Sequence, residues 1–348
     1  MTKRIVICCD GTWNTPDQPY PTNVLKMARA VKSGRQIRSR GRHEPDVLND
    51  AGIGAGGMFD RWGGGAFGRG LVKNIGDAYR FPIQNYAPRD QVFLFGFSRG
   101  AYTARSTVGL IRNCGLLTQE HGDRFDEALS LYRRRDDGPD TPEAIEFKRA
   151  YSREIELEFL GVWDTVGALG IPLRGLNRLT GSRYQFHDIV LPRIVKRAYH
   201  ALAIDELRFA FRPTFWEAKP RPRQVVDQVW FAGSHGDVGG GYQASGLAGI
   251  AFTWMLQKAE DAGLELDDEY VDASGQSVPL DHLHNSRTSF FKLSPSHARE
   301  IGSGNATNQA VHPAAIGRYD SAIPPYRPSN LEAYLSEPAH RIADVRDE

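Results

Sequence analysis

The sequence predicts an α/β protein built on a mostly parallel central sheet with helices on both faces. Short apolar runs typical of buried strands alternate along the chain with segments whose apolar residues recur at helical spacing. The stronger runs end in turn signals and polar residues, as strands do at the carboxyl edge of such a sheet. With 348 residues the chain is long enough for one large core. We therefore expect residues 1–348 to form a single domain.

The first part of the chain predicts strand, helix, strand, loop and helix in turn. Residues 4–9 are a continuous apolar run that ends at a turn. Residues 24–31 carry apolar side chains at helical spacing after a Thr-Asn pair that can cap a helix. A weaker strand begins at residues 47–48. Residues 52–70 are rich in glycine and are expected to form an active-site loop, followed by a helix at residues 71–79.

The rest of the chain continues this alternation. Strands are expected at residues 91–97, 155–163 and 225–231, which are apolar runs. Residues 198–209 are predicted to be helical, and residues 171–197, which show little pattern, are a candidate cap. The segment after residue 262 is expected to form loops and short helices that wrap the domain. Periodicity predicts further helices at residues 103–117, 125–134, 143–151 and 247–262.

The strand at residues 91–97 leads into Gly96-Phe97-Ser98-Arg99-Gly100, a Gly-x-Ser-x-Gly motif followed by a helix. In this context the motif is the nucleophile elbow of a serine hydrolase. The serine lies on a sharp, strained turn, and Gly96 and Gly100 leave room where a Cβ would collide with neighbouring elements. We expect the Ser98 hydroxyl at the carboxyl edge of the sheet, with the Arg99 backbone N–H directed at an oxyanion.

Three other strands also end in residues able to do chemistry, namely Asp10, Asp164 and His235. A serine hydroxyl needs a histidine to take its proton, and the histidine needs a carboxylate to orient it. The chain order Ser98, Asp164, His235 is the order found in α/β-hydrolases. The sequence therefore predicts an α/β-hydrolase-like fold with these three residues as the catalytic triad.

Alternatives stay open for two of the three roles. His200 and His312 are the other candidate bases, and Asp205 and Asp237 are the other candidate acids. Asp237 lies two residues after His235, so it could instead hold the glycine-rich loop in place.

The remaining predicted site residues lie on loops at the same edge. Gly11 or Thr12, after the first strand, is expected to supply the second oxyanion donor. Trp62 and Phe67 are the apolar residues expected to close over the acyl group. Substrate contacts are also expected from residues beside the triad, namely Asp10, Phe97 and Asp237.

Composition argues against several classes of protein. The net charge is +1, with both signs spread along the chain, so no nucleic-acid partner is expected. The three cysteines, Cys8, Cys9 and Cys114, are expected to be reduced thiols of a cytoplasmic protein. No signal peptide or membrane-spanning run occurs, although signal-independent export and transient membrane contact stay open. Neither a metal nor an organic cofactor is expected, since no zinc spacing occurs and residues 52–57 lack the helix of a dinucleotide motif.

Two other functions stay open beside ester hydrolysis. The fold could serve a binding protein that hydrolyses nothing. A phosphatase could also be built around Asp10, because residues 8–12 are similar to the Asp-x-Asp-Gly-Thr motif of aspartyl-phosphate enzymes. Cys8 stands where those enzymes have the nucleophilic aspartate.

Five blocks of sequence carry a resemblance to a known family, in the same order as in that family: residues 9–14, 96–102, 161–167, 200–206 and 230–242. Through most of its length the chain resembles the α/β-hydrolase-like family catalogued as domain of unknown function number 2235, which also supplies the catalytic module of type VI secretion phospholipase effectors. The resemblance implies a triad of Ser98, Asp164 and His235. It also implies hydrolysis of carboxylic esters, with phospholipids as substrates of the secreted members and a smaller soluble ester as the alternative here.

Overall fold

The computed structural model describes residues 3–11, 14, 18–32, 46–50, 64–134, 138–166, 190–216, 220–288, 296–302 and 308–346, with the backbone alone for 46–50 and 64–69. Its main sheet has seven strands in the order β2-β1-β3-β6-β7-β8-β9, and every neighbouring pair is parallel. A separate antiparallel pair joins β4 to β5. The strands are β1 (Arg4–Cys9), β2 (Asp46–Asp50), β3 (Gln91–Phe97), β4 (Leu116–Leu117), β5 (Ser152–Arg153), β6 (Leu157–Trp163), β7 (Val195–Ala203), β8 (Val225–Phe231) and β9 (Gln309–Val311).

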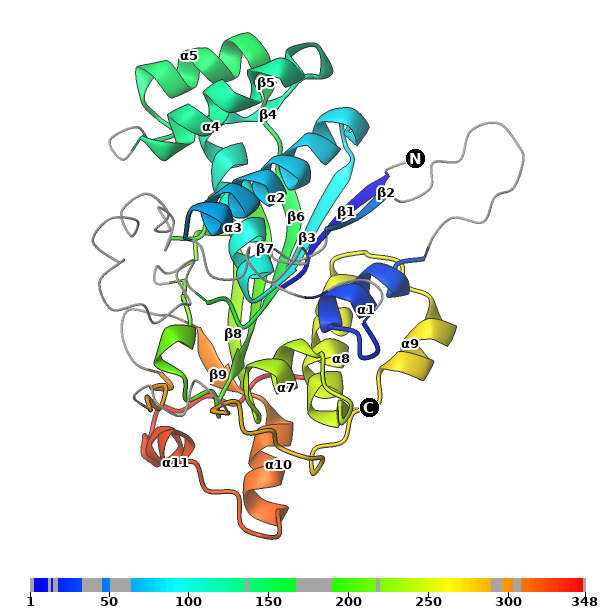
Figure 1. Cartoon of the computed structure of the whole chain (residues 1–348), viewed down its shortest axis with the longest axis vertical. Helices are drawn as coiled ribbons and strands as arrows, with labels where there is room; N and C mark the ends of the chain where they lie inside the picture. The colour runs from blue at the N-terminus through cyan, green and yellow to red at the C-terminus, as the bar shows by residue number, and fades with distance from the viewer. Residues whose placement is uncertain are drawn as a thin grey trace.

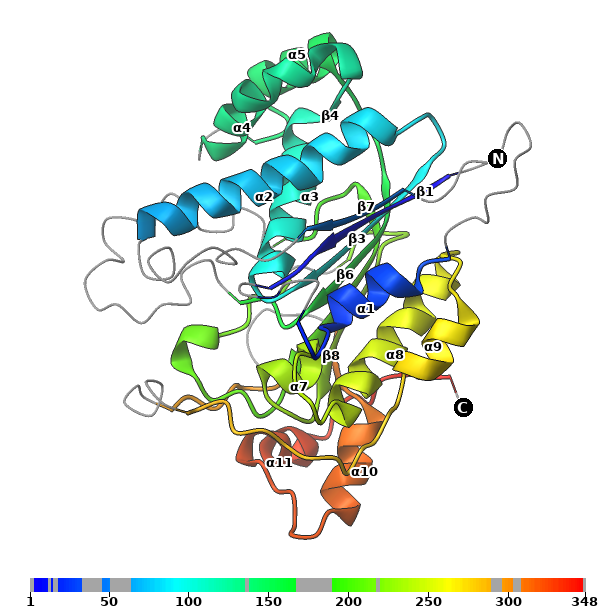
Figure 2. The ribbon, with the colours of Figure 1, turned by 45° about the vertical axis from the view of Figure 1, so that its right-hand side comes forward.

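Helices cover both faces of this sheet (Figures 1 and 2). One face carries α2 (Gly64–Asn85) and α3 (Arg99–Cys114), with α4 (Phe125–Arg133) and α5 (Pro142–Tyr151) packed beside them. The other face carries α1 (Asn23–Ala30) and α8 (Gly246–Asp261). The predicted fold class is confirmed: the chain has the α/β-hydrolase-like arrangement of a mostly parallel sheet between helices. The remaining helices are η1 (Gln119–Arg124), η2 (Phe209–Phe211), α7 (His235–Gly239), α9 (Asp268–Ser274), α10 (Pro313–Ser321) and α11 (Ser329–Ser336).

The prediction of a helix at residues 198–209 is wrong. Residues 198–203 belong to β7, a central strand hydrogen-bonded to β6 on one side and β8 on the other. Helices cover both faces of this strand, so apolar residues are buried on both and the alternation that would mark a strand is absent. The strand also takes residues 195–197 from the expected cap, and residues 167–189 lie outside the described part of the chain.

The expected loop at residues 52–70 also needs correction. Helix α2 begins at Gly64, so residues 64–70 are helical despite four glycines. Leu71 and Ile75 bury their side chains in the core and anchor the helix, and extending an existing helix by further residues costs much less than nucleating one. Residues 51–63 lie outside the described part.

The segment after residue 262 adds a strand that the sequence analysis missed. Strand β9 has only three residues, too few for a periodic pattern, and extends the sheet beyond β8. Helices α10 and α11 pack beside it (Figure 1). Within the described ranges, no helix combines the length and apolarity needed to cross a membrane.

Candidate active site

The nucleophile elbow has the geometry that its motif predicts. Ser98 lies between β3 and α3 with φ 57° and ψ −121°, a left-handed conformation that strains a residue with a side chain. A Cβ on Gly100 would lie 2.0 Å from the carbonyl oxygen of Cys9, and one on Gly96 would lie 2.6 Å from Cα of Ala101. Both glycines are therefore needed for the close approach of the elbow to β1 and to α3.

The register of the parallel strands places Ser98 beside Asp164. Phe97 pairs with Trp163 across β3 and β6, and the Ser98 N–H donates to the Trp163 carbonyl at 3.0 Å. Asp164 follows Trp163 directly and also has a positive φ, of 40°. The ring of His235 packs against that of Phe97, with centroids 4.6 Å apart. The three predicted triad residues therefore lie at one edge of the sheet.

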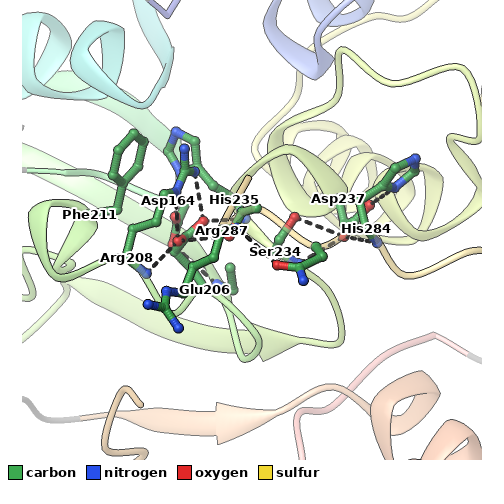
Figure 3. Close-up of polar contacts among 12 residues, drawn as sticks. Asp164, Glu206, Arg208, Phe211, Ser234, His235, Asp237, His284 and Arg287 are labelled. Atoms are coloured by element: carbon green, nitrogen blue, oxygen red, sulfur yellow. Dashed lines mark hydrogen bonds and ion pairs between the residues drawn. The ribbon is translucent and has the colours of Figure 1, made fainter. Parts of the chain in front are cut away.

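Asp164 and His235 form a buried hydrogen-bonded pair (Figure 3). Oδ2 of Asp164 accepts from Nδ1 of His235 at 2.5 Å, and Oδ1 accepts from the Ala203 N–H at 3.1 Å. Asp164 is fully buried and His235 is 7% exposed. Because Nδ1 faces the carboxylate, Nε2 is the nitrogen that can exchange a proton with a nucleophile.

The surroundings shift the pKa values of both members of this pair. Burial alone would raise the pKa of Asp164, but the charge of Arg299 and the hydrogen bonds from His235 and Arg299 hold it well below its usual range. Burial lowers the pKa of His235, against the opposing effect of the Asp164 carboxylate. The pair therefore holds an ionised aspartate beside a neutral imidazole, which is the resting state of a general base.

A second carboxylate holds His235 from its backbone side. Oε2 of Glu206, a fully buried residue, accepts the His235 N–H at 3.3 Å, and Oε1 accepts the Ser286 hydroxyl at 3.0 Å. Arg208 donates to both Glu206 oxygens, at 2.8 and 2.7 Å, and its guanidinium lies 3.5 Å from the centroid of Phe211. The Phe211 ring in turn packs against His235 with centroids 5.0 Å apart (Figure 3). The imidazole is thus held from several sides.

Asp237 holds the glycine-rich turn after β8, which is the alternative role predicted for it. Its Oδ2 accepts from the Ser234 N–H at 2.9 Å and from the Ser234 hydroxyl at 3.0 Å. Its Oδ1 accepts from Nδ1 of His284 at 2.5 Å (Figure 3). Tyr242 stacks on that imidazole. Asp237 is 1% exposed, so its contacts favour a structural role over the predicted contact with substrate.

The carboxylate of Asp10 is likewise engaged in hydrogen bonds with residues between β1 and α1. Its carboxylate accepts from the Thr22 hydroxyl at 2.6 Å, from Nδ2 of Asn14 at 3.0 Å and from the Gly11 N–H at 2.6 Å. A Cβ on Gly11 would lie 3.3 Å from Cβ of Ser98, so the loop does adjoin the nucleophile. The Gly11 N–H points at Asp10, however, which argues against its predicted role as an oxyanion donor.

The other predicted site residues differ in how far the structure describes them. Arg99 opens α3, so its N–H lies at the helix N-terminus next to Ser98. Thr12 and Trp62 lie outside the described part, and Phe67 is placed only as a backbone position in α2. Throughout the described ranges, no three acidic, histidine or cysteine side chains gather as metal ligands.

The alternative bases and acid have other structural roles. His200 is fully buried, its Nε2 accepts the Thr165 N–H at 3.1 Å, and burial together with the charge of Arg105 lowers its pKa to about 3. His312 caps α10. Asp205 accepts from the Gly233 N–H at 2.7 Å and so holds the turn that follows β8.

Four residues around the site carry no sequence motif that marks them: Glu206, Arg208, His284 and Arg299. Glu206 follows the strand β7, and a correct assignment of that strand would have placed it at the carboxyl edge with the triad. Arg299 lies in an irregular segment with no motif, so no local signal could have found it.

A family model for the catalytic domain of Tle1-like phospholipase effectors of the type VI secretion system matches residues 3–258. The matched residues include Ser98, Asp164 and His235 and leave out Arg299. The uncharacterized protein YEL023C of Saccharomyces cerevisiae is 29% identical over 239 residues, which cover 63% of this chain and 33% of the yeast protein. The chain therefore spans about a third of this curated relative.

Solved structures also share similarity with the chain. An uncharacterized protein from Pseudomonas aeruginosa is 19% identical with a TM-score of 0.46, covering 80% of this chain and 49% of that one. The Tle1 effector bound to the VgrG spike is 19% identical with a TM-score of 0.39, covering 70% and 52%. A lipase/esterase from Lactobacillus plantarum is 15% identical with a TM-score of 0.34, covering 76% and 88%.

Proposed function

The chain belongs to the family of Tle1-like phospholipase effectors of the type VI secretion system through its catalytic domain, and from this premise we propose that it is a serine hydrolase of carboxylic esters in lipids. The observation that carries the proposal is the buried Asp164–His235 pair, joined at 2.5 Å beside the strained elbow of Ser98. A strained serine and an oriented imidazole at one sheet edge are the parts that acyl transfer needs. Phospholipids are the substrate class that the family favours. The predicted cytoplasmic location stays a prediction.

In the proposed mechanism Ser98 attacks the ester carbonyl while Nε2 of His235 takes the hydroxyl proton. The C–O bond of the tetrahedral intermediate breaks, and His235 returns the proton to the departing alcohol, which leaves an acyl group on Ser98. Water then attacks the acyl group with His235 again as the base, so a carboxylic acid is released and Ser98 is restored. Asp164 stays ionised and stabilises the imidazolium in both halves, which its lowered pKa supports.

The N-terminus of α3 is placed to stabilise the negative charge that develops on the carbonyl oxygen of the substrate. The Arg99 N–H lies at the start of α3, where the helix dipole favours an anion. We propose Arg99 as one oxyanion donor. The occupied Gly11 N–H leaves the second donor to a neighbouring loop residue, and Thr12 stays the candidate from the sequence.

No observation favours the phosphatase alternative. Asp10 is 6% exposed, and its two oxygens accept three hydrogen bonds from the chain itself. Burial, despite those bonds, raises the pKa of this carboxyl.

Labelling with a fluorophosphonate and substitution of Ser98 together test the proposal. We expect the probe to label Ser98, located by mass spectrometry of the peptides, and Ser98→Ala to lower hydrolysis of p-nitrophenyl butyrate and of phosphatidylcholine vesicles by roughly 10⁴-fold or more. Ser152→Ala is the matched control, because Ser152 lies in β5 at the separate two-stranded sheet. Undiminished turnover by folded Ser98→Ala would overturn the mechanism. Hydrolysis of p-nitrophenyl phosphate that survives Ser98→Ala would instead indicate a phosphatase.

A further inference from the structure

The carboxylate of Asp164 has a second charged partner besides His235. Nη1 of Arg299 donates to Oδ1 at 2.6 Å and Nη2 donates to Oδ2 at 3.0 Å, so the guanidinium bridges both oxygens. Arg299 is 3% exposed and Asp164 is fully buried. A buried, bidentate ion pair of this kind is rigid and holds the carboxylate plane in one orientation.

We infer that Arg299 is a positioning residue of the proposed hydrolase, one that fixes Asp164 toward His235 and limits the basicity of His235, so that the base stays unprotonated at mildly acidic pH. This inference depends on the proposed function. It adds a residue from outside the matched range 3–258 to the catalytic apparatus and assigns the site a working pH range that extends below neutral.

The same guanidinium ties together three parts of the site. Nη1 also donates to the carbonyl of Ala203 at 2.9 Å, and the Ala203 N–H donates to Asp164. Nη2 also donates to the carbonyl of Phe211 at 2.5 Å, and the Phe211 ring packs against His235. The Arg299 backbone is held in turn by Asn330 of α11, whose Nδ2 donates to its carbonyl at 3.0 Å. Loss of Arg299 would therefore free both the Asp164 carboxylate and the Phe211 segment that packs against His235.

The charges around His235 explain the effect on its protonation. Asp164 and Glu206 are the two carboxylates that face it, and each is neutralised by an arginine, Arg299 and Arg208 respectively. His200, on strand β7, is neutral because burial, together with the charge of Arg105, lowers its pKa to about 3. Because an arginine is paired with each carboxylate, Asp164 and Glu206 offset only part of the desolvation of an imidazolium at His235. Removing Arg299 would leave Asp164 with an uncompensated charge and would make His235 more basic.

The pH dependence of ester hydrolysis tests this inference with three variants. In Arg299→Met we expect the acid limb of kcat/KM for p-nitrophenyl butyrate to move up by about one pH unit, because an unpaired carboxylate stabilises the imidazolium. The plateau kcat should fall by about 10- to 100-fold as Asp164 loses its orientation. In Arg299→Lys the charge remains but the bidentate geometry is lost. We therefore expect a kcat below that of the wild type, with the acid limb in its wild-type position.

Arg318→Met is the matched control for removing a buried guanidinium. Arg318 is 9% exposed and donates to the carbonyls of Pro279 and Asp281, at 2.7 and 2.9 Å, without bonding to a carboxylate. We expect its kcat and its pH profile to match those of the wild type.

Each outcome separates this inference from the proposed function. If the wild-type protein hydrolyses esters through labelled Ser98 but the acid limb of folded Arg299→Met does not move, the role of Arg299 is overturned and the hydrolase stands. If Ser98 is not labelled and no ester is cleaved, the proposed function itself fails. If circular dichroism shows that Arg299→Met does not fold, the kinetics of Arg299→Lys test the inference instead. An upward shift of the acid limb of Arg299→Lys, or a wild-type kcat for it, would contradict the inference.

Discussion

Replacing Gly100 by alanine should destabilise the protein strongly, although the same change in a helix ordinarily stabilises. Gly100 is the second residue of α3, and its missing Cβ would lie 2.0 Å from the carbonyl oxygen of Cys9 and 2.4 Å from that of Asp10. Side-chain Cβ atoms essentially never approach closer than 3.0 Å, so β1 and α3 would have to separate by about 1 Å. Both contacts are with backbone atoms, which cannot rotate away. We expect a loss of about 3 kcal/mol or more in the free energy of unfolding, at the upper end of overpacking costs.

Gly317→Ala is the matched control for this prediction. Gly317 lies inside α10 with nothing within 4 Å of the position of a Cβ, so alanine there should stabilise by about 0.5–1 kcal/mol through helix propensity and the unfolded-state entropy. Urea unfolding of both variants, with unchanged m values, measures the two effects, and they should have opposite signs. Gly100→Ala should also lose most ester hydrolysis, because Ser98 lies two residues away. A Gly100→Ala protein as stable as the wild type would refute the argument that backbone contact with β1 dictates this glycine.

Two further predictions concern pH and the turn after β8. Burial lowers the pKa of His200 to about 3 and that of His312 to about 4. Below pH 6.5 the unfolded chain therefore binds protons at these histidines that the folded chain does not. Between pH 7 and pH 5 each histidine should remove about 2 kcal/mol from the free energy of unfolding. Urea unfolding at the two pH values measures this loss, and equal stabilities would contradict it. Asp237→Ala leaves the Ser234 N–H without its acceptor and frees His284, so we expect a loss of about 2 kcal/mol in stability and about 10-fold in kcat for p-nitrophenyl butyrate. Wild-type values in both assays would show that Asp237 does not stabilise the turn after β8.

The sequence by itself determined those features that depend on local chemistry. The elbow at Ser98 was predictable because a strand, two glycines and a helix must follow one another at fixed spacing for a strained serine to form. The placement of Ser98, Asp164 and His235 at one edge of the sheet was predictable as well, since the carboxyl ends of parallel strands share one edge wherever the strands lie in the sheet. These inferences needed no knowledge of which strands are neighbours.

Tertiary structure decided the features that depend on what a segment packs against. Residues 198–203 became strand β7 because helices bury both of its faces, and an apolar run without alternation fits a helix and a fully buried strand equally well. Asp10 bonds to Thr22, 12 positions later, and Asp237 bonds to His284, 47 positions later. The spacing of residues along the chain does not specify which of these hydrogen bonds will form. Arg299 reaches Asp164 across 135 positions of sequence, and a contact of that separation exists only once the sheet and the C-terminal segment have packed together.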